Sequence, residues 1–246
     1  TGLEAAHLRP AGLYYLAGWG RLNVLFAGSP CGGALVSRTA ETRANRFFPL
    51  KALPPMPLRA PAEDAAAGRS GQLRALHTSR FQMLRLRARF AARYLKNALR
   101  GRPEPSFPRF TVTVAAMVTR SGDGRVLTVA GERSAAGQLR ALPRCAAPGD
   151  RPPWEAMSAH LAAVSGVKPA LHWAGLWHDA AANALELDFA AEASQAQSGE
   201  WTAARLAALE DRDAAYLAQT GAAGQIWMID ARASATHERA LPDQRA

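Results

Sequence analysis

Residues 110–120 (FTVTVAAMVTR) are rich in β-branched side chains, and polar Thr alternates with apolar Val over residues 111–114, the period of two that a half-buried β-strand shows. Residues 121–124 read Ser-Gly-Asp-Gly, a combination that favours a tight hairpin turn. Residues 125–132 (RVLTVAGE) then return with strand-like composition. The pattern therefore predicts a β-hairpin near the middle of the chain.

The chain beyond this hairpin mixes further strands with helices. A helix is predicted over residues 152–165, because proline stands at its start and Gly166 directly follows its end. A second helix is expected from Thr202, a good N-cap residue, to about Asp211. Strand-like composition marks residues 138–143, 171–177, 184–192 and 225–230. This order of elements predicts an α+β sandwich.

Residues 72–100 carry a different, helical pattern. Apolar side chains recur there at steps of three and four, and the segment contains neither proline nor an acidic residue. This spacing predicts a basic amphipathic helix, which Gly101 and Pro103 end. Its apolar stripe consists of Phe81, Leu84, Ala88, Ala91, Leu95 and Ala98/Leu99.

The chain ahead of this helix gives fewer signals. Residues 12–28 form its most apolar stretch, but they are interrupted by Arg21 and Asn23 and fall short of the roughly 20 apolar residues that a membrane span needs. We expect a buried or interfacial segment there, and an extended connector over the proline-rich residues 49–61. The expected organisation is an N-terminal extension with a Pro-rich linker (1–70), the basic helix (71–102), a main domain (103–230) and a C-terminal tail (231–246).

The charge of the chain is strongly asymmetric. Its 246 residues hold 30 Lys+Arg and 20 Asp+Glu, a formal net charge of +10. Residues 1–102 carry +13 and residues 103–246 carry −3. We therefore expect a polyanionic partner to meet the first half. The Arg-rich, acid-poor stretches 38–46 and 72–80 also share the character of organellar transit peptides, which makes them candidates for targeting sequence.

The cations of the predicted helix are the candidate binding residues. With no carboxylate in the segment to pair with, they repel one another unless an outside anion neutralises them. RNA phosphates are the preferred partner; a basic membrane-surface helix and a plain solvated face are the alternatives. The candidate RNA-binding residues are Arg74, Arg80, Arg85, Arg87, Arg89, Arg93, Lys96 and Arg100.

Cysteine and histidine offer no clear metal site. Cys31 and Cys145 are the two cysteines, which excludes a disulfide framework and a Cys-based zinc site. His160 has no second ligand within the following helical turn. His172 and His178 stand six apart on a predicted strand, so we expect both to face one side, without a third ligand. We interpret all three histidines as structural.

The order of short motifs in the second half resembles the Nudix hydrolase family. Leu142-Pro143 ends a strand, Pro148-Gly149-Asp150 forms a loop, and a helix runs from Trp154-Glu155-Ala156 through Leu161 to Gly166-Val167. The resemblance covers about residues 110–219. It implies a Nudix-like mixed-sheet α/β/α sandwich, here preceded by the basic extension with its amphipathic helix.

Nudix chemistry depends on glutamates that hold a divalent metal on one face of this helix. Anchoring the family's box on Gly166 places residues 159–164 (AHLAAV) where the family has Arg-Glu-aliphatic-x-Glu-Glu. Every metal-binding carboxylate is missing, and Asp150 lies one residue too far from the helix to replace the first Glu. We therefore expect no catalytic residue, no metal, no cofactor and no small-molecule substrate.

A degenerate box behind a basic arm resembles the Nudix-like proteins of the mitochondrial large ribosomal subunit. Residues 200–202 (EWT), Leu206 and residues 216–219 (YLAQ) resemble the closing helix of such proteins. This resemblance implies a structural, non-enzymatic role in the central protuberance, in the mitochondrial matrix. The implied partners are rRNA and neighbouring mitochondrial ribosomal proteins, with no stable membrane insertion.

Two alternatives stay open. A pseudoenzyme subunit of another organellar assembly, such as a respiratory complex, would use the basic arm on acidic proteins or lipids. A Nudix-type hydrolase with relocated ligands could use Glu186, Asp188 and Glu192, which alternate on one strand face, as they would on an ordinary solvated strand.

Trp173 and Trp177, four apart on a predicted strand, are expected to share a face and pack under the 152–165 helix.

Overall fold

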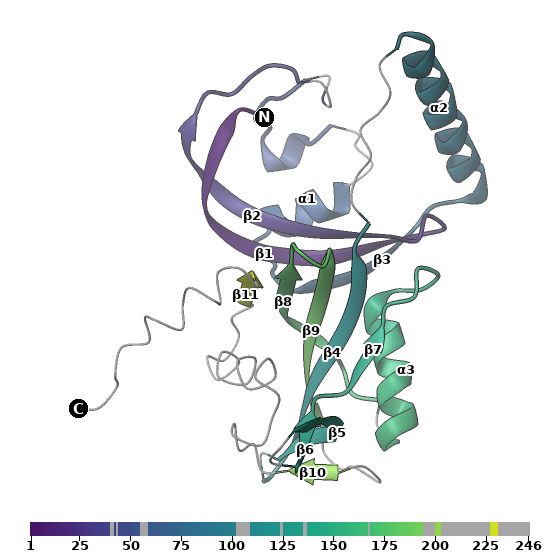
Figure 1. The fold of residues 1–246 in the computed structure, drawn as a ribbon. Coiled ribbons are helices and arrows are strands. Elements are labelled where there is room, and N and C mark those ends of the chain that lie inside the picture. Colours follow the sequence, from purple (N-terminus) through teal and green to yellow (C-terminus); the bar gives the residue numbers. More distant parts are fainter. Residues whose placement is uncertain are drawn as a thin grey trace. The chain divides into compact units, whose positions relative to one another are not determined.

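The computed structural model divides the chain into two compact units (Figure 1). Residues 1–14 and 22–74 form the first unit, and residues 15–21 and 75–246 form the second. The structure describes residues 1–39, 42, 44–54, 59–101, 109–123, 125–134, 137–166, 168–193, 200–202 and 227–230.

The first unit contains a three-stranded sheet that the sequence did not lead us to expect. Its order is β2-β1-β3, with β1 at Leu3–Ala17, β2 at Arg21–Gly33 and β3 at Gln72–His77. Gly18 and Gly20, at φ +84° and +59°, form the turn between β1 and β2. The apolar residues 12–28 therefore belong to a β-hairpin, in which Leu13 and Tyr14 are fully buried.

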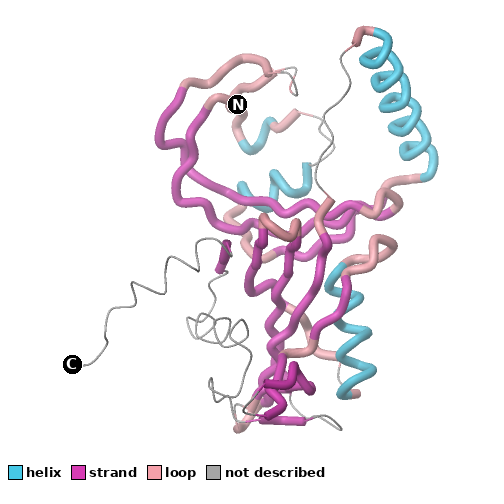
Figure 2. The backbone as a smooth tube through the Cα atoms, viewed as in Figure 1, coloured by secondary structure: helices cyan, strands magenta, loops and turns pink. Residues whose placement is uncertain are grey.

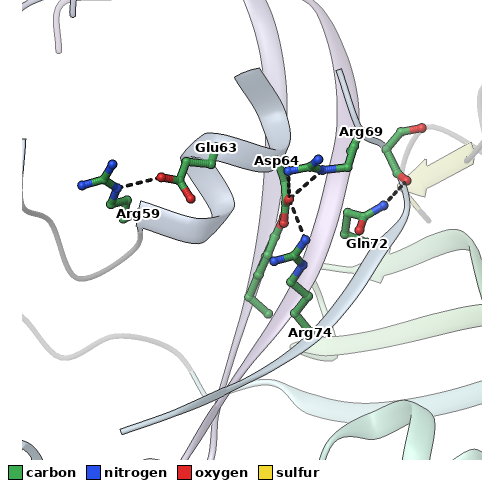
Figure 3. A network of polar contacts seen from close by, with 8 residues as sticks. Arg59, Glu63, Asp64, Arg69, Gln72 and Arg74 are labelled. Carbon is green, nitrogen blue, oxygen red and sulfur yellow. Dashed lines mark hydrogen bonds and ion pairs between the residues drawn. The ribbon is translucent and has the colours of Figure 1, made fainter. Parts of the chain in front are cut away.

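A short 3-10 helix, η1 (Leu50–Ala52), and α1 (Arg59–Ala66) complete the first unit, so the expected extended connector is in part helical. Asp64 of α1 has no exposed surface, and Figure 3 shows Arg69 and Arg74 converging on it. Tyr14 Oη donates to Asp64 Oδ2 at 3.0 Å, while Arg69 Nε and Arg74 Nη2 donate to Asp64 Oδ1 at 2.8 and 2.9 Å. Burial, the hydrogen bond to Asp64 and the charge of that carboxylate raise the pKa of Tyr14 to about 12.

The predicted basic helix is shorter than its sequence pattern indicated. Residues Gln72–His77 form strand β3, and the helix α2 runs over Arg80–Leu99. Ser79 caps its first turn, where its side chain accepts from the amide of Gln82, and the Gln82 side chain accepts from the amide of Ser79. This reciprocal cap defines the start of the helix. The spacing of apolar residues, from which the longer helix was predicted, gives no information about such a cap.

The sheet of the second unit is mixed, with the order β10-β5-β4-β9-β8-β11. Two pairs in this sheet are parallel, β4 with β9 and β8 with β11. Two other pairs are antiparallel, β4 with β5 and β8 with β9. Two short strands lie off this path, β6 on β5 and β7 on β4. The strands are β4 (Thr111–Arg120), β5 (Val126–Ser134), β6 (Gly137–Ala141), β7 (Arg144–Ala146), β8 (His172–Asp179), β9 (Ala184–Ala193), β10 (Glu200–Thr202) and β11 (Trp227–Asp230).

Helix α3 (Pro153–Ser165) lies against β4 and β7, as Figures 1 and 2 show. It buries Met157 and Leu161, and Gly166 ends it at φ +71°, the left-handed conformation that favours glycine. The mixed α+β architecture, the central hairpin and this helix are confirmed. Residues 203–211 of the second expected helix lie outside the described part, and Thr202, its expected N-cap, lies in β10.

A register shift in β8 overturns two expectations about side-chain direction. Trp173 is paired with Phe189, but Gly175 is paired with Asp188, so a bulge lies between them. Side chains of paired residues share a face, and the bulge therefore places Trp173 and Trp177 on opposite faces. His172 and His178 are separated in the same way. The strict alternation that we assumed fails because one extra residue is inserted in the strand.

Candidate functional site

Helix α2 is almost entirely exposed. Among its 20 residues only Met83 is buried, at 7% exposure. No helix in the described residues is both long and apolar enough to span a membrane. Helix α2 therefore presents its cations to solvent.

The tip of the first hairpin, Tyr15–Arg21, holds the first half of α2 in place. Arg87 Nη2 donates to the carbonyl of Gly18 at 3.2 Å. The rings of Trp19 and Phe90 meet edge to face, with centroids 5.4 Å apart. These contacts occupy one side of the helix and leave its other sides open.

Three exposed cations of α2 and its C-cap residue share one face and form what we call the basic ridge: Arg89, Arg93, Lys96 and Arg100. Their spacing of four, three and four residues places them within a narrow sector, along about 16 Å of helix axis at 1.5 Å per residue. Arg100 is the C-cap residue, where a cation also interacts favourably with the helix dipole. Since α2 contains no acidic residue, the ridge has no carboxylate within its own helix.

The other predicted RNA-binding residues are not part of this ridge. Arg80 is exposed beside the apolar stripe of α2, and Arg85, also exposed, lies one turn before Arg89, between the ridge and the stripe. Arg87 is hydrogen-bonded to the hairpin tip. Arg74 lies on β3 in the first unit and forms an ion pair with Asp64 at 2.9 Å. The structure thus brings together four of the eight candidates and assigns Arg74 to a structural ion pair.

Residues 159–164, which the sequence resemblance aligns with the Nudix box, lie in the second half of α3, with Leu161 buried. Ala159 and Ala163 are exposed and His160 is half-buried, so the face that would bear carboxylates carries small or neutral side chains. Within the residues that the structure describes, no group of three or more His, Cys, Asp and Glu side chains is arranged to hold a metal ion. Mg²⁺ and Mn²⁺ require several oxygen ligands, which this face does not offer.

The hairpin tip also contacts the loop that precedes α3. Tyr15 Oη donates to the carbonyl of Gly149 at 2.8 Å. Gly20 has φ +59°, and a Cβ added there would lie 2.5 Å from the same carbonyl oxygen. Burial raises the pKa of Tyr15, and the nearby carboxylates of Asp150 and Glu155 raise it further. The loop before α3 is thus in direct contact with the tip of the N-terminal hairpin.

The three alternating carboxylates of β9 do not form one solvated face. Glu186 and Asp188 are each only 2% exposed, whereas Glu192 is exposed and accepts from Ser121 Oγ at 2.8 Å. Glu186 Oε2 accepts from Arg144 Nε at 3.0 Å and from Thr113 Oγ1 at 3.1 Å. Sequence alternation showed which residues share a face, but it carried no signal that Arg144 of β7 would pair with Glu186.

Comparisons with known proteins indicate a distant likeness in fold. No family model and no curated protein matches the chain. A NUDIX hydrolase from Nitrosomonas europaea superposes with a TM-score of 0.40 at 9% identity, covering 51% of this chain and 81% of that one. A MutT/nudix family protein from Enterococcus faecalis gives 0.33 at 14% identity, covering 50% and 56%.

A third structure, the MutT protein from Methanosarcina mazei Go1, gives a TM-score of 0.37 at 13% identity, covering 48% of this chain and 96% of that one. The chain spans only about half the length of the Enterococcus faecalis protein. The resemblance to Nudix hydrolases is distant, concerns the fold alone, and identifies no ribosomal protein.

Proposed function

We propose that this chain is a non-catalytic Nudix-like protein that binds rRNA through the basic ridge of α2 and serves as a structural constituent of a ribonucleoprotein. In this proposal it corresponds to the protein its sequence motifs resemble, protein forty-six of the mitochondrial large ribosomal subunit. Its cellular location is then the mitochondrial matrix, and its neighbours are rRNA and other proteins of the central protuberance.

The observation that carries the RNA proposal is the basic ridge itself. Arg89, Arg93, Lys96 and Arg100 are exposed, lie within one sector of a helix and belong to a segment without acidic residues. Such a ridge is unfavourable alone, because like charges one turn apart repel, and it becomes favourable beside phosphates. Guanidinium groups add paired hydrogen bonds to phosphate oxygens.

Two observations support the non-catalytic part of the proposal. The exposed positions of α3 carry Ala159 and Ala163, which have no oxygen ligand for a divalent metal. The loop before α3 is contacted by Tyr15 and closely approached by Gly20. A hydrolase with relocated ligands would require accessible carboxylates, but Glu186 is buried and ion-paired.

The test is the salt dependence of RNA binding, measured by fluorescence anisotropy with a labelled rRNA fragment. One variant replaces the ridge: Arg89→Gln, Arg93→Gln, Lys96→Gln and Arg100→Gln. A matched control removes four exposed cations elsewhere: Arg38→Gln, Lys51→Gln, Arg125→Gln and Lys168→Gln. Both variants lower the net charge by the same amount, so they separate a specific surface from overall charge.

We expect the ridge variant to lose at least tenfold in affinity at moderate salt. Its slope of log K against log [salt] should fall by about three, since each lost phosphate contact contributes roughly 0.7–0.9. The control should retain a slope within about one unit of the unmodified chain. Equal loss in both variants would show that only net charge matters and would refute the proposed interface.

A further inference from the structure

A second face of α2 carries apolar side chains in a strict heptad pattern, which we call the seam. Its members follow at steps of three, four, three, four and three residues. This spacing corresponds to the a and d positions of a coiled coil, the narrow stripe that packs against one other helix. The seam consists of Phe81, Leu84, Ala88, Ala91, Leu95 and Ala98.

The side chains of the seam are exposed from one end of α2 to the other. Phe81 is 73% exposed, Leu84 is 66% exposed and Leu95 is 63% exposed. The three alanines are exposed as well, and Leu99, which extends the stripe at its end, is 81% exposed. The hairpin tip contacts Met83 and Phe90 on a different side of the helix, so it does not cover this face.

The shape of the seam favours another helix as its occupant. Large side chains stand near both ends, whereas Ala88 and Ala91 occupy the centre. Small side chains at the centre let a second helix axis approach closely, while the larger ones interlock at either end. A membrane-surface helix instead presents a broad apolar face of bulky side chains.

The charges beside the seam define the chemistry of that helix. Arg80 occupies a g position and Arg85 an e position, the places from which coiled-coil helices pair with charged partners, whereas Arg87, also at g, donates to the carbonyl of Gly18. A second copy of α2 would place cations against cations, because the helix has no acidic residue. The complementary helix must supply carboxylates at these positions.

We propose that α2 is one half of a two-helix coiled coil, whose other half is a helix of a partner protein with an apolar heptad seam and Glu or Asp at the flanking positions. The seam and the basic ridge lie on different sides of α2, so both can be occupied together. The inference rests on the proposed function insofar as the partner is a neighbouring protein in the same assembly.

The experiment titrates the full chain against synthetic 28-residue helical peptides, labelled for fluorescence anisotropy. One peptide has Leu at a and d and Glu at e and g, and a second differs only by Lys at e and g. The seam variant combines Leu84→Asn and Leu95→Asn. Its matched control is Phe47→Asn, which alters another exposed apolar residue (71% exposed) outside α2.

We expect saturable binding of the Glu peptide and at least tenfold weaker binding of the Lys peptide. The seam variant should lose tenfold or more in affinity for the Glu peptide, whereas the Phe47→Asn control should retain it. Helicity measured by circular dichroism confirms that the seam variant keeps α2. The affinity of the seam variant for the rRNA fragment should be unchanged, because its basic ridge is intact. A wrong proposal for the seam and a wrong proposal for the ridge therefore give different results.

Three outcomes would overturn the inference. The first is equal binding of both peptides, or no binding of the Glu peptide. The second is self-association of the chain in sedimentation that the seam variant abolishes, which would assign the face to a second copy. The third is seam-dependent binding to phosphatidylcholine/phosphatidylglycerol vesicles without binding of the Glu peptide, which would assign it to lipid.

Discussion

The phenolic hydroxyl of Tyr15 donates a hydrogen bond of 2.8 Å to the carbonyl oxygen of Gly149, 134 residues away in the sequence. This bond joins the tip of the N-terminal hairpin to the loop before α3. The same tip holds α2 through Gly18 and Trp19. One short turn thus contacts both α2 and the loop before α3.

Gly20→Ala should destabilise the protein more than Gly101→Ala. Both glycines have positive φ, +59° and +63°, so alanine meets a similar backbone penalty of about 1 kcal/mol at either position. Only at Gly20 would the new Cβ lie 2.5 Å from the carbonyl oxygen of Gly149, because no atom lies within 4 Å at Gly101. The added overlap should cost about 1–3 kcal/mol more in the free energy of unfolding, measured by urea denaturation. Equal losses would contradict the tight approach of the tip to the loop.

Tyr14→Phe should change how stability depends on pH. The pKa of Tyr14 is raised to about 12 in the folded state, above its ordinary value near 10 in an unfolded chain. The folded state therefore binds more protons between pH 10 and 12, so this contribution is complete below pH 10 and is lost as the pH rises through that window.

The Phe variant should lose about 1 kcal/mol at pH 8, since it lacks the hydrogen bond to Asp64. Its free energy of unfolding should then fall less steeply than that of the unmodified protein above pH 10. Urea unfolding from pH 8 to 11.5 measures both effects, with Tyr94→Phe, at a 51% exposed tyrosine, as the control. Parallel curves for Tyr14→Phe and the unmodified chain would refute the raised pKa.

The ion pair of Arg144 and Glu186 should show strong coupling in a double-mutant cycle. Glu186 is 2% exposed, so Arg144→Met leaves a buried carboxylate without its cation and should cost about 3 kcal/mol or more. Glu186→Gln should cost less, because the side chain of Arg144 is 24% exposed and can reach water. The double variant should lose less than the two single variants together. Additive losses, measured by chemical denaturation, would indicate that the pair is not coupled.

Local signals in the sequence were sufficient for much of the second unit. Alternation and turn residues predicted β4 and β5, and the proline start and Gly166 predicted α3, because these features depend on near neighbours only. The bulge between Trp173 and Gly175 could not be predicted, since it arises from pairing with β9. The same holds for the burial of Glu186 and Asp188, which depends on strands distant in sequence.

The first unit was missed for a related reason. Strand β1 does not alternate in polarity, and it contains Pro10, a residue that is disfavoured inside strands. The turn at Gly18 and Gly20, between two apolar runs, was the available signal for a hairpin. For the candidate site, the sequence supplied the cations and their helical spacing, but only the structure places Arg74 on β3, paired with Asp64, and Arg87 against the hairpin tip.

The purified chain should hydrolyse no nucleoside diphosphate derivative in the presence of Mg²⁺ or Mn²⁺. The expectation follows from the exposed Ala159 and Ala163 at the box positions, which cannot bind a metal. Phosphate release is measured beside an active Nudix hydrolase as the positive control. Turnover that disappears in Glu186→Gln, with the fold retained by circular dichroism, would contradict a non-catalytic role.

The central claim is that this chain is a structural part of a large ribosomal subunit, attached through the basic ridge. Sucrose-gradient sedimentation of lysed mitochondria that contain the tagged chain tests it most directly. We predict that the chain travels with the large ribosomal subunit, and that the ridge variant shifts toward the top of the gradient while the four-cation control does not. A chain that sediments with a membrane complex, or free of any particle, would contradict the account.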